Sequence, residues 1–175
     1  MGEIMLFARQ SIAALSLVGA FAAQAACPST PTANRFKLEG AELTDYKTGL
    51  VWSRCAVGRS WNGSTCTGEA SLLRHEEALA TAESMQGWRL PNVKELTSIA
   101  DLGCTNPALD STAFPGAGVA KVAKVLPNGS AYGYWSSTPQ PDNVFYAWEV
   151  NMIDGGASWM SRDYRFAVLL VRSGP

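Results

Sequence analysis

The sequence is poor in the residues from which catalytic and metal sites are usually built. It has one histidine (His75), no G-x-S-x-G motif and no C-x-x-C pair. His75 beside Glu76 or Glu77 could act as an acid–base pair, but no nucleophile motif accompanies it, and we expect it on the surface of a helix. The scarcity excludes the common hydrolase signatures and a paired-cysteine zinc site, and predicts a protein that is not an enzyme.

Charge is also scarce. Charged residues make up 17% of the chain, and the formal net charge is −1 at pH 7. A chain so close to neutrality lacks the broad positive field that nonspecific nucleic-acid binding requires. We therefore expect no nucleic-acid partner.

A long apolar run occurs only near the N-terminus. Arg9 precedes the apolar stretch Ser11–Ala22, and Ala23-Gln24-Ala25 fits the small-residue rule of a cleavage site. Residues 1–25 are therefore predicted to be a signal peptide cut after Ala25. The remaining chain, with no further membrane span, is expected to be exported, whether periplasmic, secreted or at the cell surface.

The cysteines that remain after cleavage are even in number: Cys27, Cys55, Cys66 and Cys104. An even count in an exported chain favours disulfides over metal binding. Cys55 and Cys66 flank a short loop rich in Gly, Ser and Asn and form the natural local pair. Cys27 would then join Cys104 and tie down the mature N-terminus. Three connectivities are formally open, and we favour this one.

The mature chain is predicted to form one domain over residues 35–175, after an extended lead-in at residues 26–34 (ACPSTPTAN) that is rich in Pro, Ser and Thr. Its first part predicts three short strands: Arg35–Glu39, Ala41–Asp45 and Leu50–Ser53.

Two helices are predicted in the middle of the chain. Glu69–Met85 has apolar residues at helical spacing and charges on the other side. The second helix, about Val93–Asp101, begins inside the segment Gly87–Leu96 (GWRLPNVKEL). Asn92 is a good N-cap there, and Glu95 at position N3 can close a capping box.

The C-terminal third is predicted to be β, with candidate strands at Gly133–Thr138, Val144–Asn151, Ala157–Ser161 and Phe166–Arg172. Asp154-Gly155-Gly156 is a hairpin turn. The apolar run FAVLLV predicts a central strand covered on both faces, whereas Val119–Leu126 fits either a strand or a short helix. The fold class is therefore α+β, with two helices packed on a mostly antiparallel sheet and stabilised by disulfides.

Several motifs follow one another in a recognisable order: Thr44–Trp52 (TDYKTGLVW), Trp88–Leu96 (WRLPNVKEL), Ala113-Phe114-Pro115, Tyr134–Thr138 (YWSST) and Val171-Arg172. Together they resemble the Lcl C-terminal domain family, a bacterial domain named after the C-terminal domain of a collagen-like adhesin. The resemblance spans about Arg35 to Arg172 and implies an exported or surface domain. In the adhesin this domain attaches to sulfated host polysaccharides. The present chain has no collagen repeats and no basic excess, so the resemblance implies the fold more than the ligand.

The turn RLP…E and the final VR strand also resemble a C-type-lectin-like or formylglycine-generating-enzyme-like architecture. That enzyme needs a reactive cysteine pair late in the chain, and no cysteine follows Cys104. Gln140-Pro141-Asp142-Asn143 resembles the QPD loop with which C-type lectins hold calcium and a sugar. Gln140, Asp142 and Asn143 are therefore candidate calcium ligands, against the alternative of an ordinary turn.

Two of the six tryptophans are predicted to lie on the surface: Trp61 in the disulfide loop and Trp159 near a hairpin, with Asp163 four residues further along. Trp52, Trp88 and Trp135 are expected in the core. The sequence thus predicts an exported recognition domain for a glycan or a surface protein, with self-association open. The alternative is an accessory or structural subunit of a surface apparatus such as a pilus or secretion system.

Overall fold

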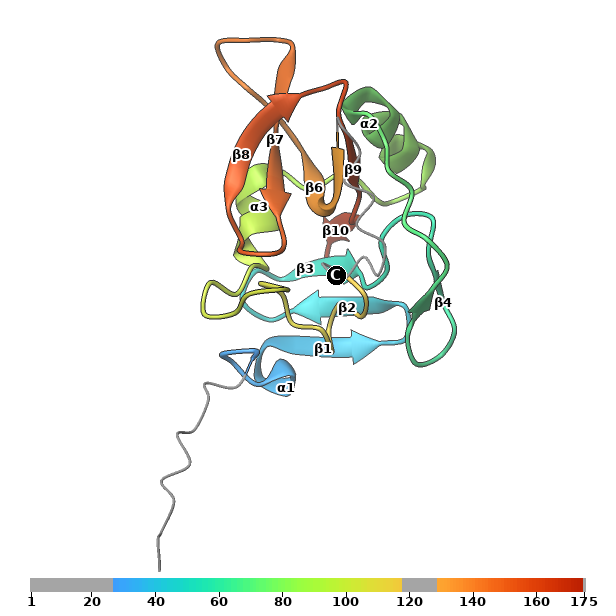
Figure 1. Cartoon of the computed structure of the whole chain (residues 1–175). Coiled ribbons are helices and arrows are strands. Elements are labelled where there is room, and N and C mark those ends of the chain that lie inside the picture. The colour runs from blue at the N-terminus through green and yellow to red at the C-terminus, as the bar shows by residue number, and fades with distance from the viewer. Residues whose placement is uncertain (1–26, 118–128, 175) are drawn as a thin grey trace, which may run out of the picture.

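A computed structural model describes residues 27–117 and 129–174 of the chain. The predicted signal peptide and the segment Val119–Leu126 lie outside these residues. Two four-stranded sheets dominate the described chain, one below the other in Figure 1. Within these ranges, no helix combines the length and hydropathy needed to span a bilayer.

The first sheet has the strand order β1-β2-β3-β10, and all its pairs are antiparallel. Its strands are β1 (Phe36–Glu39), β2 (Glu42–Asp45), β3 (Leu50–Ser53) and β10 (Val171–Ser173). The second sheet has the order β8-β7-β6-β9, with β6 and β9 parallel. Its strands are β6 (Gly129–Pro139), β7 (Tyr146–Asn151), β8 (Ala157–Ser161) and β9 (Arg165–Ala167).

Three helices and a small ribbon complete the described fold: α1 (Thr32–Arg35), α2 (His75–Ser84), α3 (Val93–Ser98), and the pair β4 (Ser60–Trp61) with β5 (Cys66–Thr67). The mixed helix and sheet content with antiparallel pairing agrees with the predicted α+β class. The disulfides are Cys27–Cys104 and Cys55–Cys66, the two pairs that the sequence favours.

The second sheet separates two parts of the core. On one side, α3 and the first sheet enclose a cluster that includes Trp52, Leu96 and Val150. On the other side, α2 covers a cluster that includes Ala78 and Trp135. Strands β6 and β7 contribute residues to both clusters. The end of this sheet away from the first sheet carries the β6–β7 loop and is its open end (Figure 1).

The predicted start of the first long helix was wrong. The helix begins at His75 and not at Glu69, because the residues before it are held extended. Leu73 exchanges two backbone hydrogen bonds with Phe166, at 2.9 and 3.0 Å. The Glu77 carboxylate then accepts from the Arg74 N–H at 2.9 Å and caps the first turn.

The predicted strand Phe166–Arg172 was also wrong as a single strand. β9 pairs with β6 in the second sheet, and β10 pairs with β3 in the first, so the chain changes sheets at residues 168–170. The Val168 and Leu170 carbonyls accept from Val57 and Ser53, at 2.9 Å each. Residues 166–171 are buried, as expected, but they join two sheets and do not lie at the centre of one.

Smaller differences concern ends and short elements. The lead-in is not wholly extended, since Thr32–Arg35 forms one helical turn after Pro31. The second predicted helix starts at Val93 as expected but ends at Ser98. The hairpin turn is confirmed: Gly155 has φ +79° and its N–H donates to the Asn151 carbonyl at 2.8 Å.

Candidate functional site

Three segments meet at the open end of the second sheet. They are the β6–β7 loop at residues 140–145, the strand β8, and the β8–β9 turn at residues 162–164. The Arg162 N–H donates to the Phe145 carbonyl at 2.9 Å, which joins the turn to the loop. The Gln140 N–H donates to the Tyr146 carbonyl at 3.1 Å and closes the base of the loop.

An aromatic face, formed by Tyr146, Trp148 and Trp159, lies on one side of this end. Trp148 pairs directly with Trp159 across β7 and β8, and Tyr146 lies two residues away on the same side. The Tyr146 and Trp159 rings meet edge to face with centroids 5.5 Å apart. This contact orients the Trp159 ring, while 52% of the residue remains exposed to solvent.

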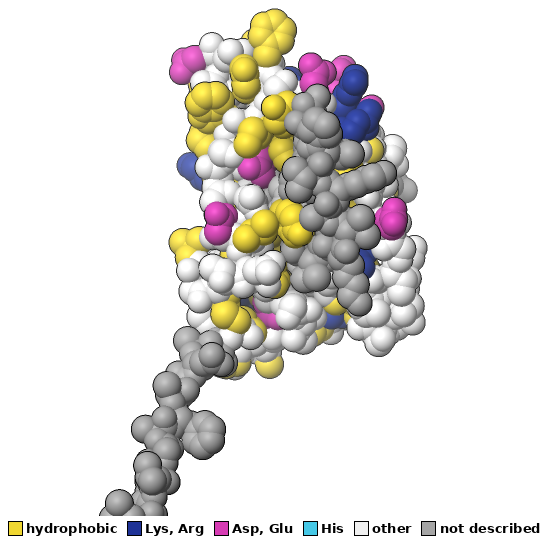
Figure 2. All heavy atoms as spheres, viewed as in Figure 1, with side chains coloured by type: hydrophobic (Ala, Val, Ile, Leu, Met, Phe, Trp, Pro, Cys, Tyr) yellow, Lys and Arg dark blue, Asp and Glu magenta, His cyan; other side chains and the backbone are white. Residues whose placement is uncertain are grey.

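The tip of the β6–β7 loop is also apolar and exposed. Val144 and Phe145 form this apolar tip, with 72% and 73% of their surfaces exposed. Figure 2 shows hydrophobic side chains gathered over the top of the molecule, where this loop and β8 lie in Figure 1. Exposed large apolar side chains that gather in one place are typical of a binding surface.

The polar candidates of the same loop are poorly arranged for calcium. Asn143 Oδ1 accepts from the Phe145 N–H at 3.0 Å, as in an ordinary Asx turn. That leaves Asp142, which is exposed, and Gln140, whose Oε1 is buried with no hydrogen-bond partner. Calcium needs six to eight oxygens, and the described residues include no cluster of three acidic, histidine or cysteine side chains. The loop side chains present therefore do not fit the ion.

The other two ligand candidates, Asp163 and Trp61, are carried by different sheets of the molecule. Asp163 lies in the β8–β9 turn, beside the loop, and its N–H donates to Ser161 Oγ at 3.4 Å. Trp61 lies on β4, in the disulfide loop, and the Arg54 guanidinium covers its ring at 4.1 Å from the centroid. Trp61 therefore does not join the aromatic face.

His75 is buried and not on the surface, contrary to expectation. Only 1% of the residue is exposed, and its ring packs edge to face on Trp135 with centroids 5.1 Å apart. Burial lowers the pKa of His75 below its usual 6.5. Nε2 lies 2.9 Å from the Ser136 carbonyl oxygen and donates to it, because a carbonyl can only accept. The histidine thus fastens α2 to β6, which backs the site.

Glu149 is a buried carboxylic acid that no sequence pattern singles out. It lies on the opposite side of β7 from the aromatic face and is 3% exposed. Ser158 Oγ donates to its Oε1 at 2.8 Å, and its Oε2 has no partner. Burial raises the pKa of Glu149 to about 7. A strand glutamate between apolar neighbours looks like a solvent-facing residue, so sequence alone could not find it.

The sequence model of the Lcl C-terminal domain matches residues 41–172, which is more than half of the chain. The chain belongs to the Lcl C-terminal domain family. Comparison with curated proteins found no match. All the motifs that suggested the resemblance fall inside the matched residues.

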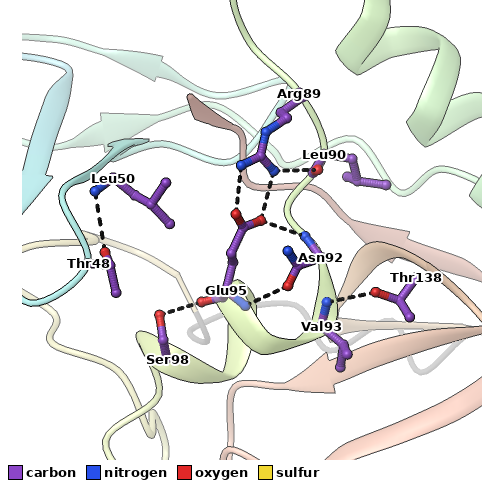
Figure 3. A network of polar contacts seen from close by, with 9 residues as sticks. All are labelled: Thr48, Leu50, Arg89, Leu90, Asn92, Val93, Glu95, Ser98 and Thr138. Atoms are coloured by element: carbon purple, nitrogen blue, oxygen red, sulfur yellow. Dashed lines mark hydrogen bonds and ion pairs between the residues drawn. The ribbon is translucent and has the colours of Figure 1, made fainter. Parts of the chain in front are cut away.

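The most recognisable motif of this Lcl C-terminal domain has a structural role (Figure 3). Asn92 Oδ1 accepts from the Glu95 N–H at 2.9 Å, and Glu95 Oε2 accepts from the Asn92 N–H at 2.8 Å, which confirms the predicted capping box. The Arg89 guanidinium also donates two hydrogen bonds to the Glu95 carboxylate, at 2.6 and 2.7 Å. The motif fixes the start of α3 against the sheets and brings no free group to a ligand.

A shallow hollow beside this motif is lined by Gly87, Trp88, Arg89, Arg172 and Ser173. Its two guanidinium groups are already engaged. Arg89 pairs with Glu95, and Arg172 pairs with Glu42 and lies over the Trp88 ring at 5.3 Å. The hollow is therefore neutral overall, and the aromatic face is the better candidate site.

Proposed function

We propose that the chain is an exported, non-enzymatic recognition domain that binds a carbohydrate chain through the aromatic face. The observation that carries the proposal is the half-exposed Trp159 ring, braced by Tyr146 at 5.5 Å. A flat indole held rigidly offers an apolar surface for the C–H groups of a sugar ring, and little side-chain entropy remains to be lost. Membership of the Lcl C-terminal domain family supports a recognition role.

The surroundings of the aromatic face suit a sugar better than a purely apolar ligand. Asp142, Asn143 and Asp163 lie on the loop and turn that border it, and all three are exposed. Sugar hydroxyl groups need such donors and acceptors at the rim of an apolar contact. Export is inferred from the signal-like N-terminus and is supported by the two disulfides.

The non-enzymatic role is inferred from the histidine and the carboxylates. His75 is committed to the Ser136 carbonyl in the interior, and the Glu95 carboxylate to Arg89 and the helix cap. We also infer a C-type-lectin-like architecture. Two helices on antiparallel sheets and a disulfide-closed loop support that inference.

The test is a glycan array probed with the mature protein, followed by titration of the strongest-binding glycan. We expect Trp159→Ala to weaken binding by about tenfold or more, since one aromatic contact is lost. Tyr46→Ala is the matched control, because Tyr46 is 59% exposed on a turn of the first sheet. Chelating calcium should leave affinity unchanged. An array without binders, or equal affinity of Trp159→Ala and wild type, would contradict the proposal.

One observation favours the alternative function, an accessory subunit of a surface apparatus. The apolar tip offers two neighbouring aliphatic and aromatic side chains, Val144 and Phe145, with no polar group of their own. Such a tip suits a protein partner better than a sugar. A photoreactive side chain in place of Phe145 would then cross-link in cells to a component of that apparatus, while the glycan array stays blank.

A further inference from the structure

The two four-stranded sheets have four edge strands, β1, β10, β8 and β9, and three of the four are protected against further pairing. A free edge presents unpaired backbone N–H and C=O groups, and proteins usually cover or charge such edges. β9 is covered because Leu73 exchanges both hydrogen bonds with Phe166. β10 is covered in the same way, because Arg89 exchanges both with Val171. β1 carries exposed charges, with Lys37 and Glu39 paired at 2.9 Å.

β8 has none of these protections. Its sequence, Ala157–Ser161 (ASWMS), contains no charge and no proline. It forms the outer margin of the second sheet in Figure 1, and no described element lies along its free side. Among the edges of the two larger sheets, β8 alone is left able to accept another strand.

The register shows which groups face the open side. The Asn151 N–H donates to the Gly156 carbonyl and the Arg162 N–H to the Phe145 carbonyl, so these are hydrogen-bonded pairs. Bonded and non-bonded pairs alternate along an antiparallel ladder. The backbone groups of Ala157, Trp159 and Ser161 therefore point away from β7 and are spaced symmetrically about Trp159, although the Ser161 carbonyl already accepts from the Tyr164 N–H at 2.9 Å.

We propose that β8 pairs with β8 of a second copy of this chain, antiparallel and centred on Trp159. The symmetric spacing makes the edge self-complementary: Trp159 would lie opposite Trp159 of the partner subunit, and Ala157 opposite Ser161 of the partner subunit. Opposed residues in such a pair put their side chains on the same face. The half-exposed Trp159 ring would lie beside its symmetry mate on the same face of the sheet, and no buried charge would oppose the contact.

The pairing also lengthens the aromatic face, a consequence that rests on the proposed function. Two copies would place their Tyr146 and Trp159 side chains in one stripe across the two-fold axis, which a long carbohydrate chain could span. A second contact on the same chain raises apparent affinity without any new kind of interaction. The pairing itself is tested without ligand, so its failure is distinct from failure of carbohydrate binding.

The test is sedimentation velocity of the mature protein from low to high micromolar concentration. A strand pair is small for a specific interface, so we expect a dimer that dissociates on dilution. Ala157→Lys with Ser161→Lys sets like charges opposite each other and should give a monomer throughout. Ala157→Lys with Ser161→Asp sets opposite charges across the axis and should restore the dimer. Near-ultraviolet circular dichroism checks that both variants are folded.

A cross-linking variant tests the register. Directly bonded residues of an antiparallel pair have Cα atoms about 5.5 Å apart, within the range of a disulfide. Trp159→Cys should therefore form a covalent dimer on oxidation, faster than Val144→Cys, an exposed control on the apolar tip. Monomer at every concentration, including the case in which another protein's strand uses β8, would overturn the proposal. So would a dimer that the paired lysines leave intact.

Discussion

The side chain of Glu149 is buried in the protein interior, with little free space around it. Gly133 lies directly against it: a Cβ at Gly133 would come within 2.7 Å of Glu149 Oε2 and 2.5 Å of Phe166 Cδ1. Glycine is thus required because the carboxyl group and the phenyl ring occupy the space that a side chain would fill. Burial makes the carboxyl group resist ionisation, and the hydrogen bond from Ser158 only partly opposes this effect.

Stability should therefore depend on the protonation of Glu149. Below its ordinary pKa of 4.5 the group is neutral in both states. Between 4.5 and about 7 the unfolded chain ionises while the folded protein keeps its proton, so the free energy of unfolding falls as pH rises. A pKa difference of this size corresponds to about 3 kcal/mol.

Glu149→Gln removes this ionisation and keeps the acceptor for Ser158. We expect the variant to exceed the wild type in free energy of unfolding by up to about 3 kcal/mol above pH 7, and to match it near pH 4. Urea denaturation of both proteins at the two pH values measures this difference, in which the titration of His75 and other groups cancels. An identical difference at both pH values would show that Glu149 ionises normally.

At the scale of single elements, α3 depends on its first turn. The helix has only six residues, Val93–Ser98, so it cannot persist without its cap and its packing. Asn92 and Glu95 satisfy its first N–H groups, and the Val93 N–H donates to Thr138 Oγ1 at 3.0 Å. The cap thereby fixes the helix that covers the core side of β7.

Replacing the cap should cost stability in a predictable amount. We expect Asn92→Ala to lower the free energy of unfolding by about 1 kcal/mol. Lys94→Ala, at an exposed position of the same helix, is the control and should change it by less than about 0.5 kcal/mol. Equal effects in thermal or urea denaturation would mean that the Asn92 side chain contributes nothing to the cap.

Sequence patterns predicted the helices, strands and turns better than they predicted which of these elements pair or pack together. The cap at Asn92 and the turn at Gly155 are local, and both were found where expected. The run Phe166–Val171 correctly predicted burial but not the change of sheet, because hydrophobicity does not specify which strand a residue pairs with. The buried position of His75 depends on where α2 begins, and the distant contact of Leu73 with Phe166 sets that point.

The candidate site was predicted only in part for a related reason. The position of Trp159 beside a hairpin correctly indicated exposure. Tyr146, which braces it, sits on the neighbouring strand, and strand register cannot be read from one sequence. Trp61, the other predicted surface tryptophan, lies on β4 under the Arg54 guanidinium, a contact that the sequence does not show.

At the scale of the whole molecule, the two disulfides close loops of very different length. Cys27 and Cys104 are 77 residues apart, and Cys55 and Cys66 are 11 apart. On the chain-entropy model these loops are worth about 4.5 and about 2.8 kcal/mol. The longer one ties the start of the described chain to the loop after α3.

We therefore expect Cys27→Ser with Cys104→Ser to destabilise the protein more than Cys55→Ser with Cys66→Ser. Urea denaturation of the two double variants measures the order. Alkylation of the denatured, unreduced wild type serves as control and should label no cysteine, in keeping with the absence of free cysteines among the described residues. A larger loss for the shorter loop would show that native packing, and not chain entropy, dominates.

The change of sheet at residues 168–170 also bears on when the protein can fold during its synthesis. β9 and β10 are the last described strands to be made, yet β3 needs β10 as its neighbour and the core needs Leu169 and Val171. Until the ribosome has released them, the emerging chain has an incomplete core and open strands. For an exported chain, this delay would keep the polypeptide unfolded and able to pass through a translocation channel. Folding and disulfide formation would then occur after the chain has crossed the membrane.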